Sequence, residues 1–251
     1  MTSNGTLIDE KCVLRLAQAG MKTIAISLDG LKATHEQLRG VPGSYDLAVN
    51  ALRLLKKSEA FRTVQTVTVV SELNIRELPQ LFELVSDLQI DSWKITPIEP
   101  MGDAKGRQDL FLDEKEHYQL LDFIKEKRLR APFEITYGCS HMLPEAYEAK
   151  VRKHEFLCGA GTMIASIASN GDVLPCLDID CRELVKQGNV LQNDFIEVWE
   201  SRFEVFRKNK ANTSEFCKDC EQRRTCQGDS WHSWNFEENR PRVCFEKHIV
   251  F

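Results

Sequence analysis

The sequence predicts an α/β protein in two parts. Residues 1–138 are expected to form a parallel sheet with helical crossovers, and residues 139–251 a small cysteine-rich domain with a β-hairpin. Three observations support this division. Helix-like and strand-like segments alternate up to about residue 138. Eight of the nine cysteines follow that point, and Asn170-Gly171 separates two short apolar segments, which is a strong hairpin signal.

The first part begins with a helix and a strand. Residues 7–19 have helical apolar spacing, with Asp9 and Glu10 near the start and Gly20 as a C-cap. The run TIAISL at 23–28 is typical of a buried parallel strand.

The following segments keep the alternation. A helix is expected at 44–57, where the Ser44 hydroxyl can cap the first turn. The β-branched run VQTVTVV predicts a strand at 64–70. The remaining elements are expected at 76–88 (helix), 92–98 (strand), 113–127 (helix) and 133–137 (strand). Repeated strand–helix–strand units imply parallel strands, so we expect an α/β layer or part of a barrel.

The second part has fewer regular elements. Segments 163–168 and 172–176 flank Asn170-Gly171 and predict the hairpin, with a type I′ turn because both residues tolerate a positive φ. A short helix is expected at 195–207. The domain boundary is therefore placed near residue 138.

Composition excludes several classes of protein. With 42% hydrophobic and 28% charged residues, the chain is typical of a soluble globular protein. A net charge of -5 and only short basic clusters, such as RKNK at 207–210, argue against nucleic acid as a partner. No apolar run reaches the length of a membrane span, and the N-terminus does not resemble a signal peptide. We therefore expect a cytoplasmic protein whose cysteines are reduced.

The cysteines of the second part have the spacing of metal ligands. CKDCEQRRTC, from Cys217 to Cys226, places three thiols among charged residues, which is atypical of a core. Cys220 follows Cys217 after two residues, a turn that aims two thiolates at one centre. Cys244 can complete a set of four. Cys158 and Cys176 flank the hairpin and can meet if Gly159 and Gly161 let the chain curl back. Spacing alone fits tetrahedral zinc and an iron–sulfur cluster about equally.

These motifs resemble a known family. CGAGTMIASIASNGDVLPC, GNVLQNDFIEVWES, CKDCEQRRTC and the later Cys244 resemble the SPASM domain of radical S-adenosylmethionine enzymes. Upstream, SNGTL, AISLDG, GVPGSYDLAVNAL, VQTVTVVSELNI and WKITPIEPMG resemble the later strands of the partial (β/α)6 TIM-like barrel of the same enzymes. The resemblance covers almost the whole chain. It favours iron–sulfur over zinc, because SPASM domains carry two auxiliary 4Fe-4S clusters.

The resemblance also implies a ligand set. The second auxiliary cluster would be held by Cys217, Cys220, Cys226 and Cys244, and the first by Cys158 and Cys176. Ser230 stands where the family has a further cysteine, so the first cluster needs another ligand. We rank Cys181 first; Cys139, Asp229 and His232 are alternatives. One 4Fe-4S cluster, the second auxiliary cluster, is therefore expected. The first auxiliary cluster is possible if one of these residues completes its ligand set.

The catalytic signature of the family, CxxxCxxC, does not occur, since no two cysteines are four positions apart. The first strand of the chain matches a middle strand of the barrel, so we expect an N-terminally truncated polypeptide. A truncated gene, a late start and a split protein would each explain this. We expect the chain alone to be unable to cleave S-adenosylmethionine, which would bind only in a complete enzyme.

Ser27 and Asp29 match positions that approach the ribose of that cofactor in the family, although a capped turn also explains them. Trp93 and Glu99 could line the same end of the barrel. The favoured interpretations are that Trp93 is a core residue and that Glu99 is solvated.

The resemblance implies a peptide or protein substrate and an electron donor such as flavodoxin or ferredoxin, and it assigns no catalytic residue. The position after Cys176 is Leu177 and not aspartate, which favours peptide maturases over sulfatase-maturing enzymes. Two alternatives come from other classes: a non-enzymatic iron–sulfur electron-transfer or scaffold protein, and a zinc-stabilised binding module.

Overall fold

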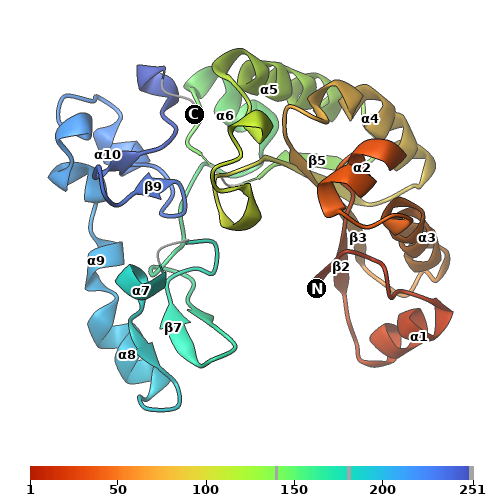
Figure 1. The fold of residues 1–251 in the computed structure, drawn as a ribbon, viewed down its shortest axis with the longest axis horizontal. Helices are drawn as coiled ribbons and strands as arrows, with labels where there is room; N and C mark the ends of the chain where they lie inside the picture. The colour runs from red at the N-terminus through yellow and green to blue at the C-terminus, as the bar shows by residue number, and fades with distance from the viewer. Residues whose placement is uncertain (139–140, 180–181, 249–251) are drawn as a thin grey trace. The chain divides into compact units, whose positions relative to one another are not determined.

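The computed structural model describes residues 1–138, 141–179 and 182–248 and divides the chain into two compact units. Unit 1 comprises residues 1–98, 108–138 and 145–154. Unit 2 comprises residues 99–107, 139–144 and 155–251. Figure 1 shows the elements of each unit. No helix in the described part of the chain combines the length and the apolar character that crossing a membrane requires.

Unit 1 is built on a five-stranded sheet in which every neighbouring pair is parallel and the strands follow one another in chain order. The strands are β1 (Thr2–Ser3), β2 (Thr23–Ser27), β3 (Thr63–Val70), β4 (Ser92–Pro97) and β5 (Glu134–Tyr137). The helices are α1 (Glu10–Gln18), α2 (Lys32–Arg39), α3 (Ser44–Lys57), α4 (Leu78–Asp87), α5 (Glu114–Arg128) and α6 (Glu145–Val151), with short 3-10 turns at Ile75–Glu77 and Gln108–Leu110. The α/β fold with a parallel sheet, the arrangement of a partial TIM-like barrel, is thereby confirmed.

The sheet buries one face more completely than the other. Along β3 the residues alternate between buried and half-buried. The buried face includes Thr66 and Thr68, whose hydroxyls donate to the carbonyls of Ile26 (3.0 Å) and Leu28 (2.7 Å). Trp93 of β4 is fully buried and donates its indole N–H to the Thr68 hydroxyl at 2.8 Å. The core therefore accepts threonine because each hydroxyl has a partner.

Helix ends in unit 1 follow local chemistry. Asp113 and Glu116 form a capping box at α5, and Asp9 caps α1 by accepting from the Cys12 N–H at 2.7 Å. Gly20 follows α1 with φ +74°, as its C-cap role requires. The expectation for Ser44 is wrong: Gly43 is the N-cap of α3, and the buried Ser44 hydroxyl has no hydrogen-bond partner among the described residues.

Unit 2 combines a three-stranded antiparallel sheet with short helices. The sheet is β6 (Ser166–Ile167), β7 (Asp172–Leu174) and β8 (Gly188–Asn189); β9 (Trp234–Asn235) and β10 (Arg240–Pro241) form a separate pair. The helices are α7 (Arg182–Val185), α8 (Phe195–Arg202), α9 (Glu204–Arg207) and α10 (Arg223–Cys226), with 3-10 turns at Gly102–Ala104, Lys210–Thr213, Glu215–Cys217 and Phe245–Lys247. The single helix expected at 195–207 is interrupted at Phe203, which is fully buried.

The hairpin forms where expected, but through a different turn. Gly171 has φ +87°, whereas Asn170 is not among the described residues with positive φ. The Ala168 N–H donates to the Asp172 carbonyl, and the Gly171 N–H donates to the Ala168 carbonyl, both at 2.9 Å. This is a three-residue loop with glycine in the left-handed position, so the type I′ prediction is wrong.

The core of unit 2 is aromatic. Phe203, Phe206 and Trp231 contact one another in sequence, with ring centroids 6.0 Å and 4.9 Å apart, and Trp231 continues to Trp234 at 6.5 Å. Val173 and Leu174 of the hairpin pack into the same cluster. Cys158 and Cys176 lie against it, so the hairpin and the helices jointly position both thiols.

Gly161 lets the chain curl between Cys158 and the hairpin. Its φ is +69°, its N–H donates to the Ile164 carbonyl at 2.9 Å, and a Cβ there would lie 2.4 Å from the Cβ of Phe206. A side chain would meet both backbone strain and the aromatic core.

We therefore expect Gly161→Ala to lower the free energy of unfolding by about 2 kcal/mol or more. Gly20→Ala is the matched control, because Gly20 has a similar φ of +74° and nothing within 4 Å of its Cβ position. Gly20→Ala should lower the free energy of unfolding by only about 1 kcal/mol, because it adds backbone strain and no steric clash. Urea unfolding followed by tryptophan fluorescence measures both. Equal losses would mean that Phe206 does not crowd Gly161.

Candidate iron–sulfur centre

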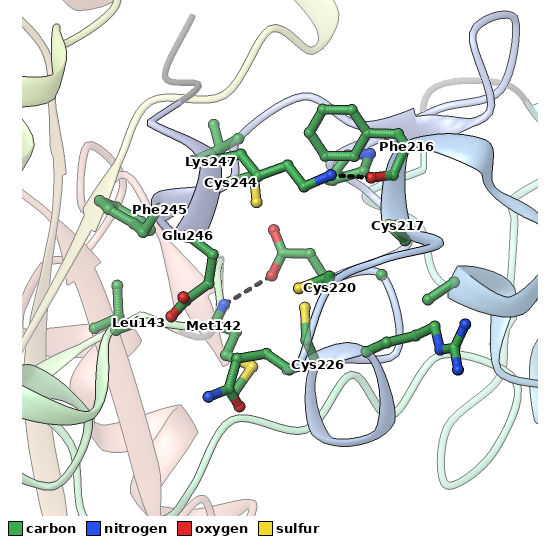
Figure 2. A pocket seen from close by; sticks show the side chains of 17 residues that line it. Met142, Leu143, Phe216, Cys217, Cys220, Cys226, Cys244, Phe245, Glu246 and Lys247 are labelled. Atoms are coloured by element: carbon green, nitrogen blue, oxygen red, sulfur yellow. Dashed lines mark hydrogen bonds between the residues drawn. The ribbon is translucent and has the colours of Figure 1, made fainter.

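Four cysteines of unit 2 line one hollow. Cys217 ends a 3-10 turn, Cys226 ends α10, and Cys244 directly precedes the turn Phe245–Lys247. Between the first two, the chain folds back through hydrogen bonds from the Cys220 N–H to the Cys217 carbonyl (3.1 Å) and from the Arg223 N–H to the Cys220 carbonyl (3.2 Å). All four thiols line the same space of about 520 Å³, part of it open to solvent. Figure 2 shows the sulfur atoms of Cys220, Cys226 and Cys244 directed into it.

The walls of this hollow are largely apolar. Leu143, Phe216, Val243 and Phe245 contribute to it. Burial raises the pKa of the Cys226 thiol to about 12, with the charge of Asp229 acting in the same direction. Burial also raises the pKa of Cys217 and of Cys244. In the metal-free chain these thiols are therefore protonated at neutral pH, and binding of a metal centre must release protons.

The thiols are not gathered closely enough to form a ready-made site for one metal ion. Among the residues that the structure describes, no group of three or more His, Cys, Asp or Glu side chains could hold a metal ion. The four thiols nevertheless line one hollow, and both an iron–sulfur cluster and a zinc ion use a set of four thiolates.

Cys158 and Cys176 form a second, smaller group. The Cys158 sulfur accepts a hydrogen bond from the Trp231 N–H at 3.4 Å, and the Cys176 sulfur accepts one from the Asp178 N–H at 3.5 Å. Burial raises the pKa of Cys176, and a charge on Cys158 adds to the effect, because the two thiols interact electrostatically. Cys181 and Cys139, the two cysteines weighed as further ligands, lie outside the described residues.

The loop 229–233 lies beside Cys158 and carries Ser230. Ser230 is buried, and its hydroxyl lies 2.9 Å from that of Ser233 and 3.3 Å from the Nε2 of His232. The hydrogen bond from the Trp231 N–H to Cys158 places this loop at the first cysteine group. The residue that replaces the family's cysteine therefore belongs to a segment that contacts Cys158.

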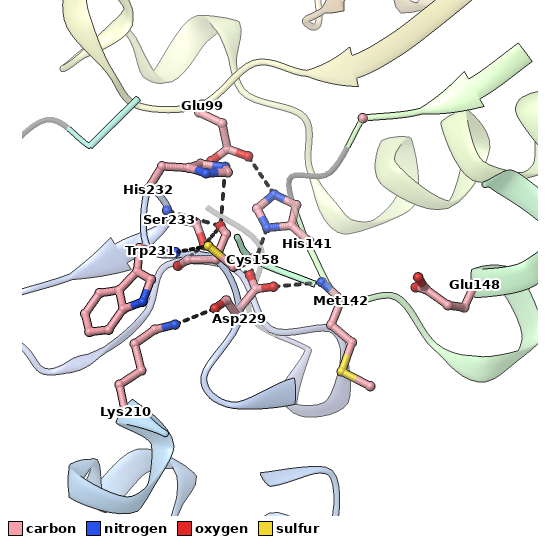
Figure 3. Close-up of polar contacts among 12 residues, drawn as sticks. Glu99, His141, Met142, Glu148, Cys158, Lys210, Asp229, Trp231, His232 and Ser233 are labelled. Carbon is pink, nitrogen blue, oxygen red and sulfur yellow. Dashed lines mark hydrogen bonds and ion pairs between the residues drawn. The ribbon is translucent and has the colours of Figure 1, made fainter. Parts of the chain in front are cut away.

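A buried charged triad holds this loop (Figure 3). His141 is fully buried, and its Nε2 and Nδ1 lie 2.7 Å from Glu99 and 3.0 Å from Asp229. Burial would lower the pKa of His141, but the carboxylates of Glu99 and Asp229 outweigh it and raise that pKa to about 10. Burial would raise the pKa of Asp229, yet the charge and hydrogen bond of His141 hold it below its usual value. His141 is therefore an imidazolium between two carboxylates.

Asp229 is fully engaged by this network. One carboxylate oxygen accepts from the Met142 N–H at 2.7 Å, and the other accepts from His141 and, at 3.1 Å, from the Ser233 hydroxyl. The geometry thus assigns this carboxylate to the triad, which makes it a poor candidate for the missing ligand of the first cysteine group. Sequence patterns did not single out His141, because its partners lie far away along the chain and form no motif.

Ser27 and Asp29 lie in unit 1, at the end of β2. Asp29 is buried; one carboxylate oxygen accepts from the Val69 N–H at 2.9 Å, and the other pairs with Arg39. The Asn74 amide donates to the Asp29 carbonyl at 2.6 Å. These contacts give Asp29 a structural role, and its contact with a cofactor ribose stays a prediction, as does that of Ser27.

Two family models match this chain. Residues 1–85 match the radical SAM superfamily, and residues 158–221 match SPASM, an iron-sulfur cluster-binding domain. The second match contains both cysteines of the first group and two of the second group.

Curated relatives match most of the chain at low identity. AdoMet-dependent heme synthase from Methanosarcina barkeri is 26% identical over 245 residues, which are 91% of this chain and 68% of the relative. Mycofactocin maturase MftC from Mycobacterium tuberculosis is 28% identical over 235 residues, which are 90% of this chain and 57% of the relative. The chain thus spans between about three fifths and two thirds of the length of these relatives.

Solved structures share the fold. The structure of anSMEcpe with bound AdoMet has a TM-score of 0.67 and 22% identity, over 92% of this chain and 65% of that chain. Streptococcus suis SuiB bound to the precursor peptide SuiA has a TM-score of 0.65 and 19% identity, over 90% of this chain and 53% of that chain. At these identities the likeness establishes the fold.

The triad predicts a pH dependence of stability. The pKa of His141 is about 10 in the folded chain against 6.5 for a free histidine, so its contribution is complete below pH 6.5 and is lost as the pH rises to about 10. Asp229, whose pKa is lowered, contributes above pH 3.8 and loses its contribution as the pH falls. Between pH 6.5 and 10 the free energy of unfolding should fall by up to about 1.4 kcal/mol per pH unit through His141.

His141→Gln should destabilise the chain by about 3 kcal/mol or more and remove this slope, because two buried carboxylates lose their cation. His154→Gln, at an exposed histidine, is the control and should keep the slope. Urea unfolding at several pH values decides; a slope that survives in His141→Gln contradicts the assignment.

Proposed function

Because this chain belongs to the radical SAM superfamily and carries its SPASM iron-sulfur domain, we propose that it is the auxiliary-cluster part of an enzyme that modifies a peptide or protein. Both matched domains bind 4Fe-4S clusters. The observation that carries the proposal is the hollow shared by Cys217, Cys220, Cys226 and Cys244. Four thiolates around one space are what such a cluster requires.

These four cysteines would hold the second auxiliary cluster. When bound, it would supply one-electron transfer. The largely apolar walls would limit the access of water to it. Lys247 interacts electrostatically with Cys217 and donates to the Phe216 carbonyl, so it places a cation at the edge of the hollow. Such surroundings tune the potential of a cluster.

Cys158 and Cys176 would hold the first auxiliary cluster. Cys181 remains the preferred further ligand, five positions after Cys176, with Cys139 and His232 as alternatives. Asp229 ranks last, because His141, Met142 and Ser233 already occupy both of its carboxylate oxygens. This group would therefore have the weaker ligand set of the two.

Cleavage of S-adenosylmethionine would need a cluster held by CxxxCxxC, a motif that these 251 residues do not contain. We propose that the chain by itself does not cleave that cofactor, and that residues outside it supply the radical. Production of 5′-deoxyadenosine by the purified chain under reducing conditions would overturn this part.

A peptide substrate is supported by relatives and neighbours. Mycofactocin maturase MftC is a relative, and SuiB and anSMEcpe were solved with bound peptides. The relatives named AdoMet-dependent heme synthase favour a second candidate, a tetrapyrrole substrate. A saturable shift of the Soret band on titrating the anaerobic protein with an iron porphyrin would support that candidate over a peptide. Flavodoxin or ferredoxin would supply electrons.

Iron analysis tests the proposal. We expect the anaerobically purified chain to be brown, with acid-labile sulfide and about eight iron atoms when both sites are filled, or about four with one. Cys220→Ala combined with Cys226→Ala should remove about four. Cys12→Ala is the control, since Cys12 lies on α1 in unit 1, and should remove none. A colourless protein with stoichiometric zinc would support the zinc-stabilised module instead.

Ser230→Cys tests the assignment of the first site. Because the loop of Ser230 contacts Cys158 through the Trp231 N–H, a thiol at position 230 can add a ligand to this cluster. We expect iron loss to a chelator to slow at least several-fold. Cys181→Ala should accelerate that loss if Cys181 is the present ligand. Unchanged kinetics in Ser230→Cys would mean that position 230 does not face the cluster.

A further inference from the structure

Lys210 places a buried ammonium group beside both cysteine groups. Only 8% of the residue is exposed. Its Nζ donates to the Asp229 carbonyl and lies 4.5 Å from the ring centroid of Trp231 and 5.2 Å from that of Trp234. Among the described residues it forms no ion pair with a carboxylate within 4 Å. Its direct partners are thus one carbonyl and two aromatic faces, and the carboxylate charge of Asp229, which also pairs with His141, acts on it from beyond ion-pair distance.

These partners leave the charge incompletely compensated. An ammonium taken out of water loses hydration energy that a single neutral acceptor does not replace. The indole faces attract a cation, but each carries only a quadrupole and no net charge. A buried lysine in such surroundings needs further negative charge nearby, and the chain places it next to thiols.

The position of Lys210 connects the two cysteine groups. Lys210, Cys158 and Cys226 line one cavity, and Figure 3 shows Lys210 near Trp231 and Asp229, with Cys158 close to the same loop. Negative charge on Cys158, Asp229, Cys226 or Cys217 acts on the Lys210 ammonium. Thiolates of both cysteine groups would therefore add to the compensation that Asp229 provides, and they would be present when both groups carry thiolate-bound clusters.

We propose that Lys210 is a shared counter-cation of the two cysteine groups and that it raises the reduction potentials of the clusters bound there. This inference rests on the proposed function, since it requires clusters at these cysteines. A reduced cluster carries one more negative charge than the oxidised form. A fixed cation stabilises the reduced form more, and net charge around a cluster is one of the factors that set its potential.

Lys210→Met tests the inference, because methionine keeps most of the side-chain length and removes the charge. Stepwise reduction of the reconstituted protein with dithionite and mediators, read by EPR, gives the potentials. We expect the ratio of reduced to oxidised cluster at a fixed potential to fall about tenfold for at least one site, a downward shift of about 59 mV for one electron. Lys208→Met is the matched control: Lys208 lines the same cavity, but its side chain is 68% exposed and pairs with Glu204. It should leave both potentials in place.

Stability separates the charge effect from damage to the fold. Without iron, Lys210→Met should melt at the same temperature as the unsubstituted chain or higher, since removing an undercompensated buried charge relieves its desolvation. With clusters bound, the same variant should shift the potential downward. Lys210→Gln, which keeps a donor for the Asp229 carbonyl, should shift it in the same direction and serves if Lys210→Met does not fold.

The outcomes distinguish two failures. If the unsubstituted chain takes up no iron, the proposed function is wrong. If it takes up iron and both Lys210 variants have the potentials of Lys208→Met, the inference about Lys210 is wrong while the proposed function stands.

Discussion

The ion triad of Glu99, His141 and Asp229 is the interaction on which the geometry of unit 2 depends. It joins three segments that are distant in the chain; His141 and Asp229 alone are 88 positions apart. Each of the three side chains is at most 4% exposed, so the imidazolium lies between its two carboxylates in surroundings that water barely reaches. Breaking such a triad would leave a carboxylate buried without its cation, which is costly. The loop that begins at Asp229 is therefore fixed.

That loop determines where several functional groups lie. Its backbone carbonyl at Asp229 accepts from Lys210, and the N–H of Trp231 donates to Cys158. Cys226, only three positions earlier, ends the helix that delivers it to the hollow. One anchored loop thus positions a cation, a thiol of the first group and a thiol of the second. This explains how short elements with little regular structure can organise two cysteine groups.

Much of the fold could be predicted because its elements carry local signals. β-branched runs marked β3, and the buried Trp93 is a core residue as expected. β1 was missed because two residues show no periodicity; it lies at the edge of the sheet, beside β2. α2 was also missed, since its sequence KATHEQLR has few apolar residues. Tertiary packing at Phe203, which no local rule signals, divides the helix expected at 195–207.

Of the residues at the candidate site, only the cysteines could be predicted from the sequence, because the turns of a metal site require a characteristic spacing of ligands. The groups that support them were misread. Glu99 was expected to be solvated and is buried, because its partner His141 follows only after a strand and a helix. RKNK was interpreted only as a short basic cluster, and its last residue, Lys210, is buried. Burial of a charge depends on partners brought close by the fold, and a linear pattern does not contain that information.

The charges of unit 2 suit the cluster-bound chain better than the metal-free one. Without metal, burial keeps the thiols of Cys217, Cys226 and Cys244 neutral. The ammonium of Lys210 is compensated by the charge of Asp229, a carboxylate that His141 also uses. Binding of a cluster would convert thiols to thiolates, release their protons and add negative charge near Lys210 in one event. The cost of burying Lys210 is then offset further in the loaded protein. Cluster binding and charge compensation are therefore coupled, and loading should become more favourable as the pH rises, because fewer protons remain to be displaced.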